Sequence, residues 1–156
     1  MVDKFGEWRA SILAVQEVPL EHTRRYGIVD GTPVGDRLVD INRIVEKPAP
    51  ESAPSRLGVA GRYILTSEIF TEIRKIPRGV GGEIQLTDAI ASLLRRQKVF
   101  AYHYEGIRYD CGSKEGFLQA TVELALQHPQ LGERHGVGPS ERKPCPPGNS
   151  DTSLNR

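Results

Sequence analysis

The hydrophobic pattern of this chain changes period near Thr66, and that change restricts the fold more than any other feature of the sequence. Before it, short runs of β-branched and aliphatic residues predict strands over residues 11–18, 26–30, 38–45 and 58–65. After it, apolar residues recur at helical spacing over 69–76 and 86–94, and Pro77 forbids continuation of the first helix. The pattern favours an α/β fold with a mixed sheet over an all-β barrel.

Local signals indicate where several elements begin and end. Gly31-Thr32-Pro33 is a turn signal that closes the second strand. Thr87 is the expected N-cap of the 86–94 helix, and Ser113 is expected to cap a third helix over 114–127 that has a broad apolar face. Two more strands are expected over 99–104 and 107–109.

Composition divides the chain into a folded part and a tail. Its 156 residues are enough for one domain with a sizeable core. Residues 136–156 are rich in Pro, Gly, Ser and Asn, which predicts a disordered tail behind a domain over 1–135. Phe5, Trp8 and Ala10 resemble the end of a helix that runs into the first strand, so we expect Met1 to lie inside a longer ancestral domain.

Charge and cysteine content indicate few special partners. The formal net charge of +1 gives no indication of a nucleic-acid or acidic-membrane partner. No apolar run is long enough to span a bilayer and no signal-peptide pattern is present, so a cytoplasmic protein without a membrane partner is expected. Cys111 and Cys145 do not form a Cys-x-x-Cys pair, and neither a zinc nor a redox site is indicated.

The segment Val45-Glu46-Lys47-Pro48 is the most informative candidate for a binding site. It places a carboxylate beside an ammonium at the end of a strand, before a proline that restricts the turn. Glu46 can accept hydrogen bonds from sugar hydroxyls, and Lys47 can pair with a phosphate. A plain surface ion pair is the alternative interpretation.

Asp110 is the second candidate, since it stands between an expected strand and the helix that begins after Ser113. α/β sheets place ligand-contacting residues at such positions. The carboxylate can hold Mg²⁺ as a hard oxygen ligand, or it can accept hydrogen bonds from the start of the following helix. The sequence alone leaves both roles open.

Several segments together resemble one enzyme family, the bacterial UTP–glucose-1-phosphate uridylyltransferases, over roughly residues 7–133. These segments, in the family's order and approximate spacing, are Tyr26-Gly27-Ile28-Val29, Val45-Glu46-Lys47-Pro48, Val59-Ala60-Gly61-Arg62-Tyr63, the stretch from Gly82 to Ile90, and Asp110-Cys111-Gly112. Glu-Lys-Pro occurs across the sugar nucleotidyltransferases. The stretch Glu-Ile-Gln-Leu-Thr-Asp-Ala-Ile is closer to the glucose uridylyltransferase branch.

The resemblance implies a role for each matching residue. Gly27 and Glu46 resemble residues that contact the glucosyl group, and Val59 falls near a backbone position that contacts the sugar. Lys47 resembles the lysine that meets the sugar phosphate and supports catalysis. Asp110 matches one of two aspartates that hold Mg²⁺. The implied reaction joins UTP and glucose 1-phosphate to give UDP-glucose and pyrophosphate.

One part of the family pattern is not found in this sequence. The Gly-x-Gly-Thr-Arg loop that holds the triphosphate is absent, which implies a partial Rossmann-like nucleotidyltransferase fold without its N-terminal strands. We therefore expect UTP to bind only if the missing half is supplied, and we expect the isolated chain to be inactive. An exposed sheet edge and apolar face would favour instability or association, including a homo-oligomer. The alternatives are a non-catalytic sugar-phosphate-binding module or partner of a separate N-terminal half, and a pyrophosphorylase that uses another nucleotide.

Overall fold

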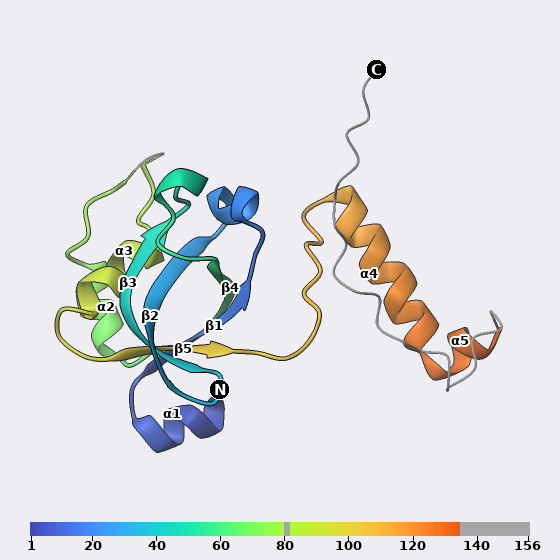
Figure 1. Cartoon of the computed structure of the whole chain (residues 1–156), viewed down its shortest axis with the longest axis horizontal. Coiled ribbons are helices and arrows are strands. Elements are labelled where there is room, and N and C mark those ends of the chain that lie inside the picture. The colour runs from blue at the N-terminus through green and yellow to red at the C-terminus, as the bar shows by residue number, and fades with distance from the viewer. Residues whose placement is uncertain (80–81, 135–156) are drawn as a thin grey trace. The chain divides into compact units, whose positions relative to one another are not determined.

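Five strands pair into one mixed sheet that closes on itself (Figure 1). The structure is a computed structural model that describes residues 1–79 and 82–134. They belong to two compact units, Met1–Glu105 and a second unit that begins at Gly106. The predicted boundary between a domain over 1–135 and a tail over 136–156 falls outside the described residues and stays a prediction.

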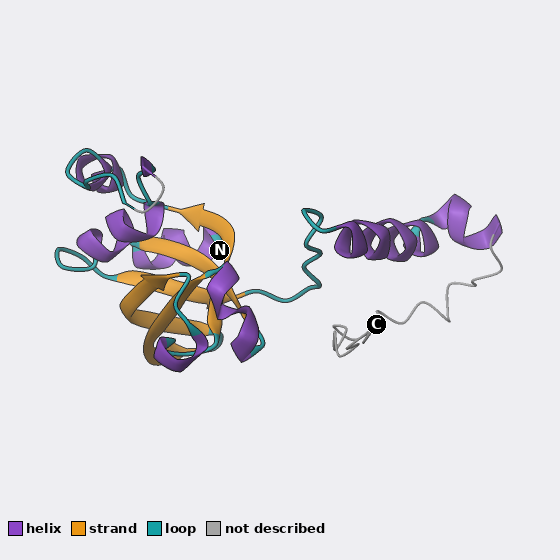
Figure 2. Cartoon of the chain, turned by 90° about the horizontal axis from the view of Figure 1, so that it is seen from above, coloured by secondary structure: helices purple, strands orange, loops and turns teal. Residues whose placement is uncertain are grey.

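The sheet of the first unit is a ring in the order β1, β4, β2, β3, β5. β1 and β5 are parallel, and all other neighbours are antiparallel, so the predicted mixed sheet is confirmed. Figure 2 shows the strands curving round one another. The strands are β1 Ser11–Glu17, β2 Gly27–Gly35, β3 Leu38–Glu46, β4 Leu57–Ile64 and β5 Val99–His103.

Because the sheet is closed, its described strands lack the exposed edge that the sequence predicted. Each of the five described strands has a neighbour on both sides, so the unpaired edge expected from the sequence is not found among them. A closed ring depends on pairing between distant segments, such as β1 with β5, and local hydrophobic periodicity carries no information about it.

Helices α2 (Glu68–Ile73) and α3 (Leu86–Leu93) pack against each other, and α3 also packs on β3. Their apolar residues Ile69, Ile90 and Leu93 join the main core with Leu13 and Val15 of β1. α2 ends earlier than predicted, because a turn at residues 74–75 precedes Pro77. The core therefore fixes the start of α3 beside the end of β3.

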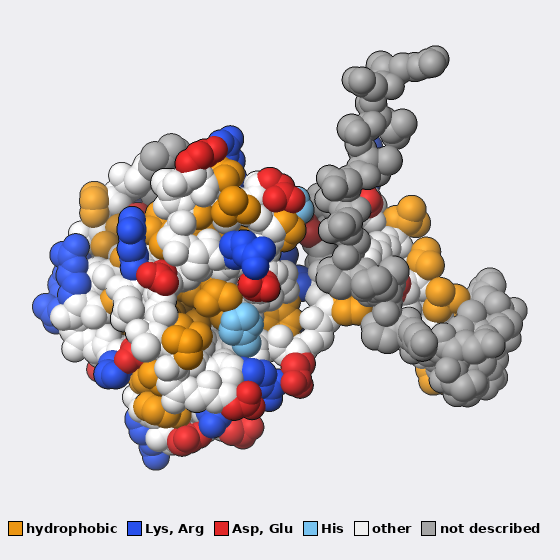
Figure 3. Space-filling view, viewed as in Figure 1, with side chains coloured by type: hydrophobic (Ala, Val, Ile, Leu, Met, Phe, Trp, Pro, Cys, Tyr) orange, Lys and Arg blue, Asp and Glu red, His pale blue; other side chains and the backbone are white. Residues whose placement is uncertain are grey.

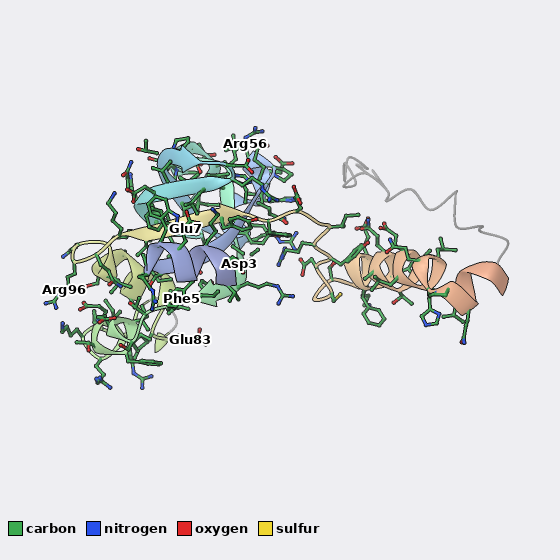
Figure 4. The ribbon with its side chains drawn as sticks, turned by 90° about the horizontal axis from the view of Figure 1, so that it is seen from below. Asp3, Phe5, Glu7, Arg56, Glu83 and Arg96 are labelled. Atoms are coloured by element: carbon green, nitrogen blue, oxygen red, sulfur yellow. The ribbon has the colours of Figure 1, made fainter. Side chains whose placement is uncertain are left out.

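A second, smaller core lies under α1 (Val2–Trp8), on which Figure 4 labels Phe5. Phe5 and Met1 pack there against a cluster of Ile12, Leu38 and Phe100. Because neighbouring residues of a strand point to opposite faces, Ile12 faces this cluster while Leu13 faces the main core. The predicted burial of β1 is thus confirmed, and it extends to both faces of the strand.

The predicted turn at Gly31-Thr32-Pro33 is wrong, since all three residues lie inside β2. Gly31 follows a register shift, and a Cβ at this position would lie 2.1 Å from the carbonyl oxygen of Asp40 on β3. The glycine therefore serves a close approach of two strands at a β-bulge. The chain instead reverses after β2, where Arg37 adopts a left-handed conformation with φ of 57°.

The second unit contains α4 (Lys114–Gln127) and α5 (Pro129–Arg134). The bounds predicted for α4 are confirmed, and Ser113 Oγ accepts a hydrogen bond from the Gly116 amide at 3.0 Å. Hydrophobic side chains stand out along this helix in Figure 3, and Phe117 and Leu118 are more than half exposed. None of the described helices is long and apolar enough to cross a bilayer.

The strand expected over 107–109 is not found, since residues 107–110 form no regular element. The segment instead leads into α4, and the Tyr109 hydroxyl donates to Glu123 Oε2 on that helix at 2.6 Å. The short run Ile107-Arg108-Tyr109 suggested a strand, but such a short run has no stability without a neighbour to pair with.

Candidate functional site

The candidate site lies where β2 begins and β3 ends. Gly27 and Glu46 are cross-strand partners in the antiparallel β2–β3 pair, so the first residue of one strand faces the last residue of the other. The sequence motifs that contain them are separate along the chain, and the sheet register brings them together. Glu46 is partly buried, with 25% of its side chain exposed.

Lys47 is the first residue beyond β3 and adopts a left-handed backbone conformation, with φ of 44°. Its amide donates to the Tyr26 carbonyl at 3.0 Å, which continues the contact between the two strand ends. A non-glycine residue in this region costs about 1 kcal/mol or more, and such strain occurs often at functional sites. The Lys47 side chain is 58% exposed.

Thr87, in the first turn of α3, supplies a direct partner for Glu46. Its hydroxyl donates to Glu46 Oε2 at 2.6 Å, and only 9% of the residue is exposed. The predicted N-cap role is wrong, because Gln85 occupies that position in the structure. The hydroxyl is engaged in a charge-assisted bond to a carboxylate instead of a bond to its own helix.

Gly27 leaves space for this contact. A Cβ on Gly27 would lie 3.3 Å from both Glu46 Oε2 and Thr87 Oγ1, which is tighter than ordinary van der Waals contact. The other carboxylate oxygen of Glu46, Oε1, lies 3.6 Å from Lys47 Nζ. Glycine at this position therefore leaves room for the carboxylate between a hydroxyl and an ammonium.

The pKa of Tyr63, near the end of β4, depends on the same carboxylate. Burial raises the pKa of its hydroxyl, and the negative charge of Glu46 raises that pKa further. The residue is still 38% exposed. An aromatic ring with a polar tip thus lies within electrostatic reach of Glu46.

Val59 has its side chain in the main core, with 7% of the residue exposed. It pairs with Val15 across β1 and β4. A side chain in this position is not available to a ligand, so contact with a sugar through Val59 would involve its backbone, as the resemblance implies. That role stays a prediction.

Asp110 lies in the second unit, so the structure does not place it relative to Glu46. Its Oδ1 accepts a hydrogen bond from the Gly112 amide at 3.3 Å, and its carbonyl oxygen accepts from the Ser113 amide at 3.0 Å. Asp110 therefore takes part in the turn that begins α4, which is one of the two roles left open by the sequence. Its role as a metal ligand stays a prediction.

The profile of a family described as nucleotidyl transferase matches residues 1–127, which is most of the chain. The chain belongs to the nucleotidyl transferase family. The chain is 48% identical over 121 residues to the UTP–glucose-1-phosphate uridylyltransferase of Pseudomonas aeruginosa, over 78% of the chain and 43% of that relative. It is 47% identical over 131 residues to the protein of the same name from Bacillus subtilis, over 84% of the chain and 45% of that relative. The chain therefore spans less than half the length of these curated relatives.

Solved structures agree with this assignment. A UDP-glucose pyrophosphorylase complexed with UDP-glucose matches with a TM-score of 0.79 and 39% identity, over 82% of this chain and 48% of that one. A UTP-bound UGPase from Acinetobacter baumannii matches with a TM-score of 0.76 and 38% identity, over 87% and 47% respectively. The predicted α/β fold class and the resemblance to uridylyltransferases are confirmed.

The described residues do not by themselves complete a magnesium site. Mg²⁺ favours about six oxygen ligands in near-octahedral geometry. Among the side chains that the structure describes, no group of three or more His, Cys, Asp or Glu residues is arranged to hold a metal. Asp110 offers a single carboxylate, so any bound Mg²⁺ would depend mainly on other oxygens.

Two residues of the site were not predicted from the sequence. Thr87 and Tyr63 both lie in segments that carry the family resemblance, but neither had a functional role assigned. Thr87 and Glu46 are 41 residues apart, and helical periodicity does not reveal such a contact. A polar β-branched residue in the first turn of an otherwise apolar helix face was the available signal.

Proposed function

We propose that this chain forms the glucose 1-phosphate side of a uridylyltransferase, which makes UDP-glucose and pyrophosphate from UTP and glucose 1-phosphate. The observation that carries the proposal is the arrangement at the end of β3, where a carboxylate held by Thr87 lies beside the exposed ammonium of Lys47. The names of both curated relatives favour uridylyl transfer over another nucleotide or a non-catalytic module.

Glu46 binds the sugar in this proposal. An ionised carboxylate only accepts hydrogen bonds, and its two oxygens offer about four lone-pair directions. Thr87 uses one of these on Oε2, which leaves the remaining directions for sugar hydroxyls. Gly27 keeps the carboxylate accessible from the β2 side because it has no side chain.

Lys47 binds the phosphate and acts as the catalytic cation. A phosphate oxygen of glucose 1-phosphate attacks the α-phosphorus of UTP, the bond to the bridging oxygen breaks, and pyrophosphate leaves with the electron pair. No covalent bond to the protein is needed, so the contribution of Lys47 is to orient the nucleophile and offset negative charge. Its exposed Nζ, 3.6 Å from Glu46 Oε1, puts both functions next to each other.

Mg²⁺ enters this proposal only through Asp110 as one candidate ligand, and no step of the reaction is assigned to it. The partners proposed for the chain are glucose 1-phosphate and UDP-glucose, with UTP bound by groups beyond those described above. No nucleic acid or membrane partner is proposed, in line with the net charge of +1.

Titration of glucose 1-phosphate into the chain, followed by calorimetry and amide NMR, tests the proposal. We expect saturable binding with shifts of the Gly27 and Lys47 amide signals, and we expect Lys47→Met to abolish it. Lys4→Met is the matched control, because Lys4 pairs with Glu7 on α1. Absence of heat and of amide shifts up to millimolar ligand would overturn the proposal. Pyrophosphate release with UTP and Mg²⁺ measures turnover separately from binding.

A further inference from the structure

Thr87 is a buried hydroxyl whose partner is an ionisable group of the candidate site. The residue is 9% exposed, and its Oγ1 lies 2.6 Å from Glu46 Oε2. A hydroxyl bonded to a carboxylate at such a short distance is a charge-assisted hydrogen bond, about twice as strong as a neutral one. The contact joins the first turn of α3 to the last residue of β3.

The two oxygens of the Glu46 carboxylate differ in how firmly they are held. Oε2 is bonded to Thr87 at 2.6 Å, whereas Oε1 is 3.6 Å from an ammonium that is largely exposed. A lysine on a flexible stem with 58% exposure does not fix an orientation. The threonine does, because its β-branched side chain has few rotamers and its backbone lies in a helix packed on the core.

The space around this bond leaves little freedom. A Cβ on Gly27 would lie 3.3 Å from Glu46 Oε2 and 3.3 Å from Thr87 Oγ1, so the three residues are in close contact. Rotation of the carboxylate away from Thr87 would leave a buried hydroxyl without its acceptor. The geometry therefore favours one carboxylate plane.

We propose that Thr87 is a positioning residue that holds the Glu46 carboxylate in the plane in which it accepts hydrogen bonds from the hydroxyls of a hexose 1-phosphate. This inference rests on the proposed function, since it assigns to Thr87 an effect on the sugar that Glu46 binds. Thr87 acts on the sugar only through Glu46, and the phosphate is recognised independently by Lys47.

A purely structural tie between α3 and the sheet is the competing explanation, and two ligands separate them. Thr87→Val removes the hydroxyl while it keeps the size and branching of the side chain. We expect this variant to bind glucose 1-phosphate about tenfold more weakly, as for loss of one hydrogen bond to a charged group. Inorganic phosphate lacks the sugar and should bind more weakly than glucose 1-phosphate. The affinity of Thr87→Val for inorganic phosphate should equal that of the unaltered chain. Thr87→Ser, which restores a hydroxyl, should recover most of the sugar affinity.

The variants are compared by calorimetry, with amide NMR spectra to confirm that each is folded. Thr121→Val is the matched control, since the Thr121 hydroxyl donates to the Phe117 carbonyl on α4. In a Glu46→Ala background, Thr87→Val should have no further effect on sugar affinity, because the residue to be positioned is gone. Thr87→Ala serves as the second variant if Thr87→Val is unfolded.

The outcomes distinguish the inference from the function on which it rests. Absence of glucose 1-phosphate binding by the unaltered chain would overturn the proposed function, and the positioning role with it. Binding by the unaltered chain together with unchanged affinity in Thr87→Val would overturn the positioning role alone. Equal loss of affinity for glucose 1-phosphate and inorganic phosphate, or a full effect in the Glu46→Ala background, would also overturn it.

Discussion

Ser92 on α3 donates a 2.7 Å hydrogen bond to Glu72 Oε2 on α2, so a buried carboxylate joins the two helices that lie over the sheet. Glu72 is 2% exposed, and its other oxygen, Oε1, lies 3.0 Å from Lys75 Nζ and 3.5 Å from Arg96 Nε. Figure 4 labels Arg96, which follows α3. Every described partner of this carboxylate is therefore on one of the two helices or just beyond them.

We predict that Glu72→Gln lowers the midpoint of thermal unfolding by several degrees. The amide keeps the shape of the side chain but loses the charge that Ser92, Lys75 and Arg96 compensate, and breaking a buried network is destabilising. Glu51→Gln is the matched control, because Glu51 is exposed on the short helical turn Pro50–Ser52. Circular dichroism during heating provides the measurement, and equal midpoints for the two variants would contradict the prediction.

The same network predicts how stability depends on pH. The hydrogen bond from Ser92, followed by that from Lys75, holds the pKa of Glu72 below its usual range. A carboxyl group with a lowered folded pKa adds stability above its unfolded pKa of about 4.3, and this stability is lost as the pH falls through the folded pKa. The free energy of unfolding, measured with urea, should fall between about pH 6 and about pH 3 in the unaltered chain. It should fall less in Glu72→Gln, which lacks the ionisable group.

Gly31→Ala should destabilise the first unit by about 2 kcal/mol or more, because the added methyl group meets the Asp40 backbone. At Gly35, in the same strand, an added Cβ has nothing within 4 Å, so Gly35→Ala is the control. Denaturant unfolding of the two variants provides the comparison. A Gly31→Ala protein as stable as Gly35→Ala would show that the strands separate readily at the bulge.

Tyr63 provides a spectroscopic test of the charge on Glu46. Burial is the larger cause of the raised pKa of Tyr63, and the Glu46 charge is the smaller one. Glu46→Gln should therefore lower the pKa of Tyr63 while leaving it above the ordinary value for tyrosine. Ultraviolet absorbance during alkaline titration measures the pKa values of the tyrosines. The transition that disappears in Tyr63→Phe belongs to Tyr63. An unchanged transition in Glu46→Gln would mean that the two groups do not interact in solution.

Elements that depend on local signals were predictable from the sequence. α4 has the predicted bounds because Ser113 caps it and the chain after Gln127 continues into a proline. The buried run of β1 and the apolar stripe of α3 were equally clear. In these segments, the pattern of side chains within about a dozen residues determines the element.

Features that depend on distant contacts were not predictable in the same way. The glycine at 31 resembles a turn residue, but the deciding contact is with Asp40 on the next strand. Thr87 resembles a helix cap, but a carboxylate from β3 is a stronger acceptor for its hydroxyl. For the candidate site, the sequence identified Gly27 and Glu46, and only the register of β2 and β3 shows that they face each other.

The parallel pairing of β1 with β5 also has a consequence for synthesis of the protein. β1 pairs with β5, the last strand of its unit, so the ring cannot close until residues up to His103 have emerged from the ribosome. Contacts of this separation raise the contact order, slow folding, and leave intermediates with exposed strands. We therefore expect nascent chains that end before Val99 to be the species most in need of chaperones.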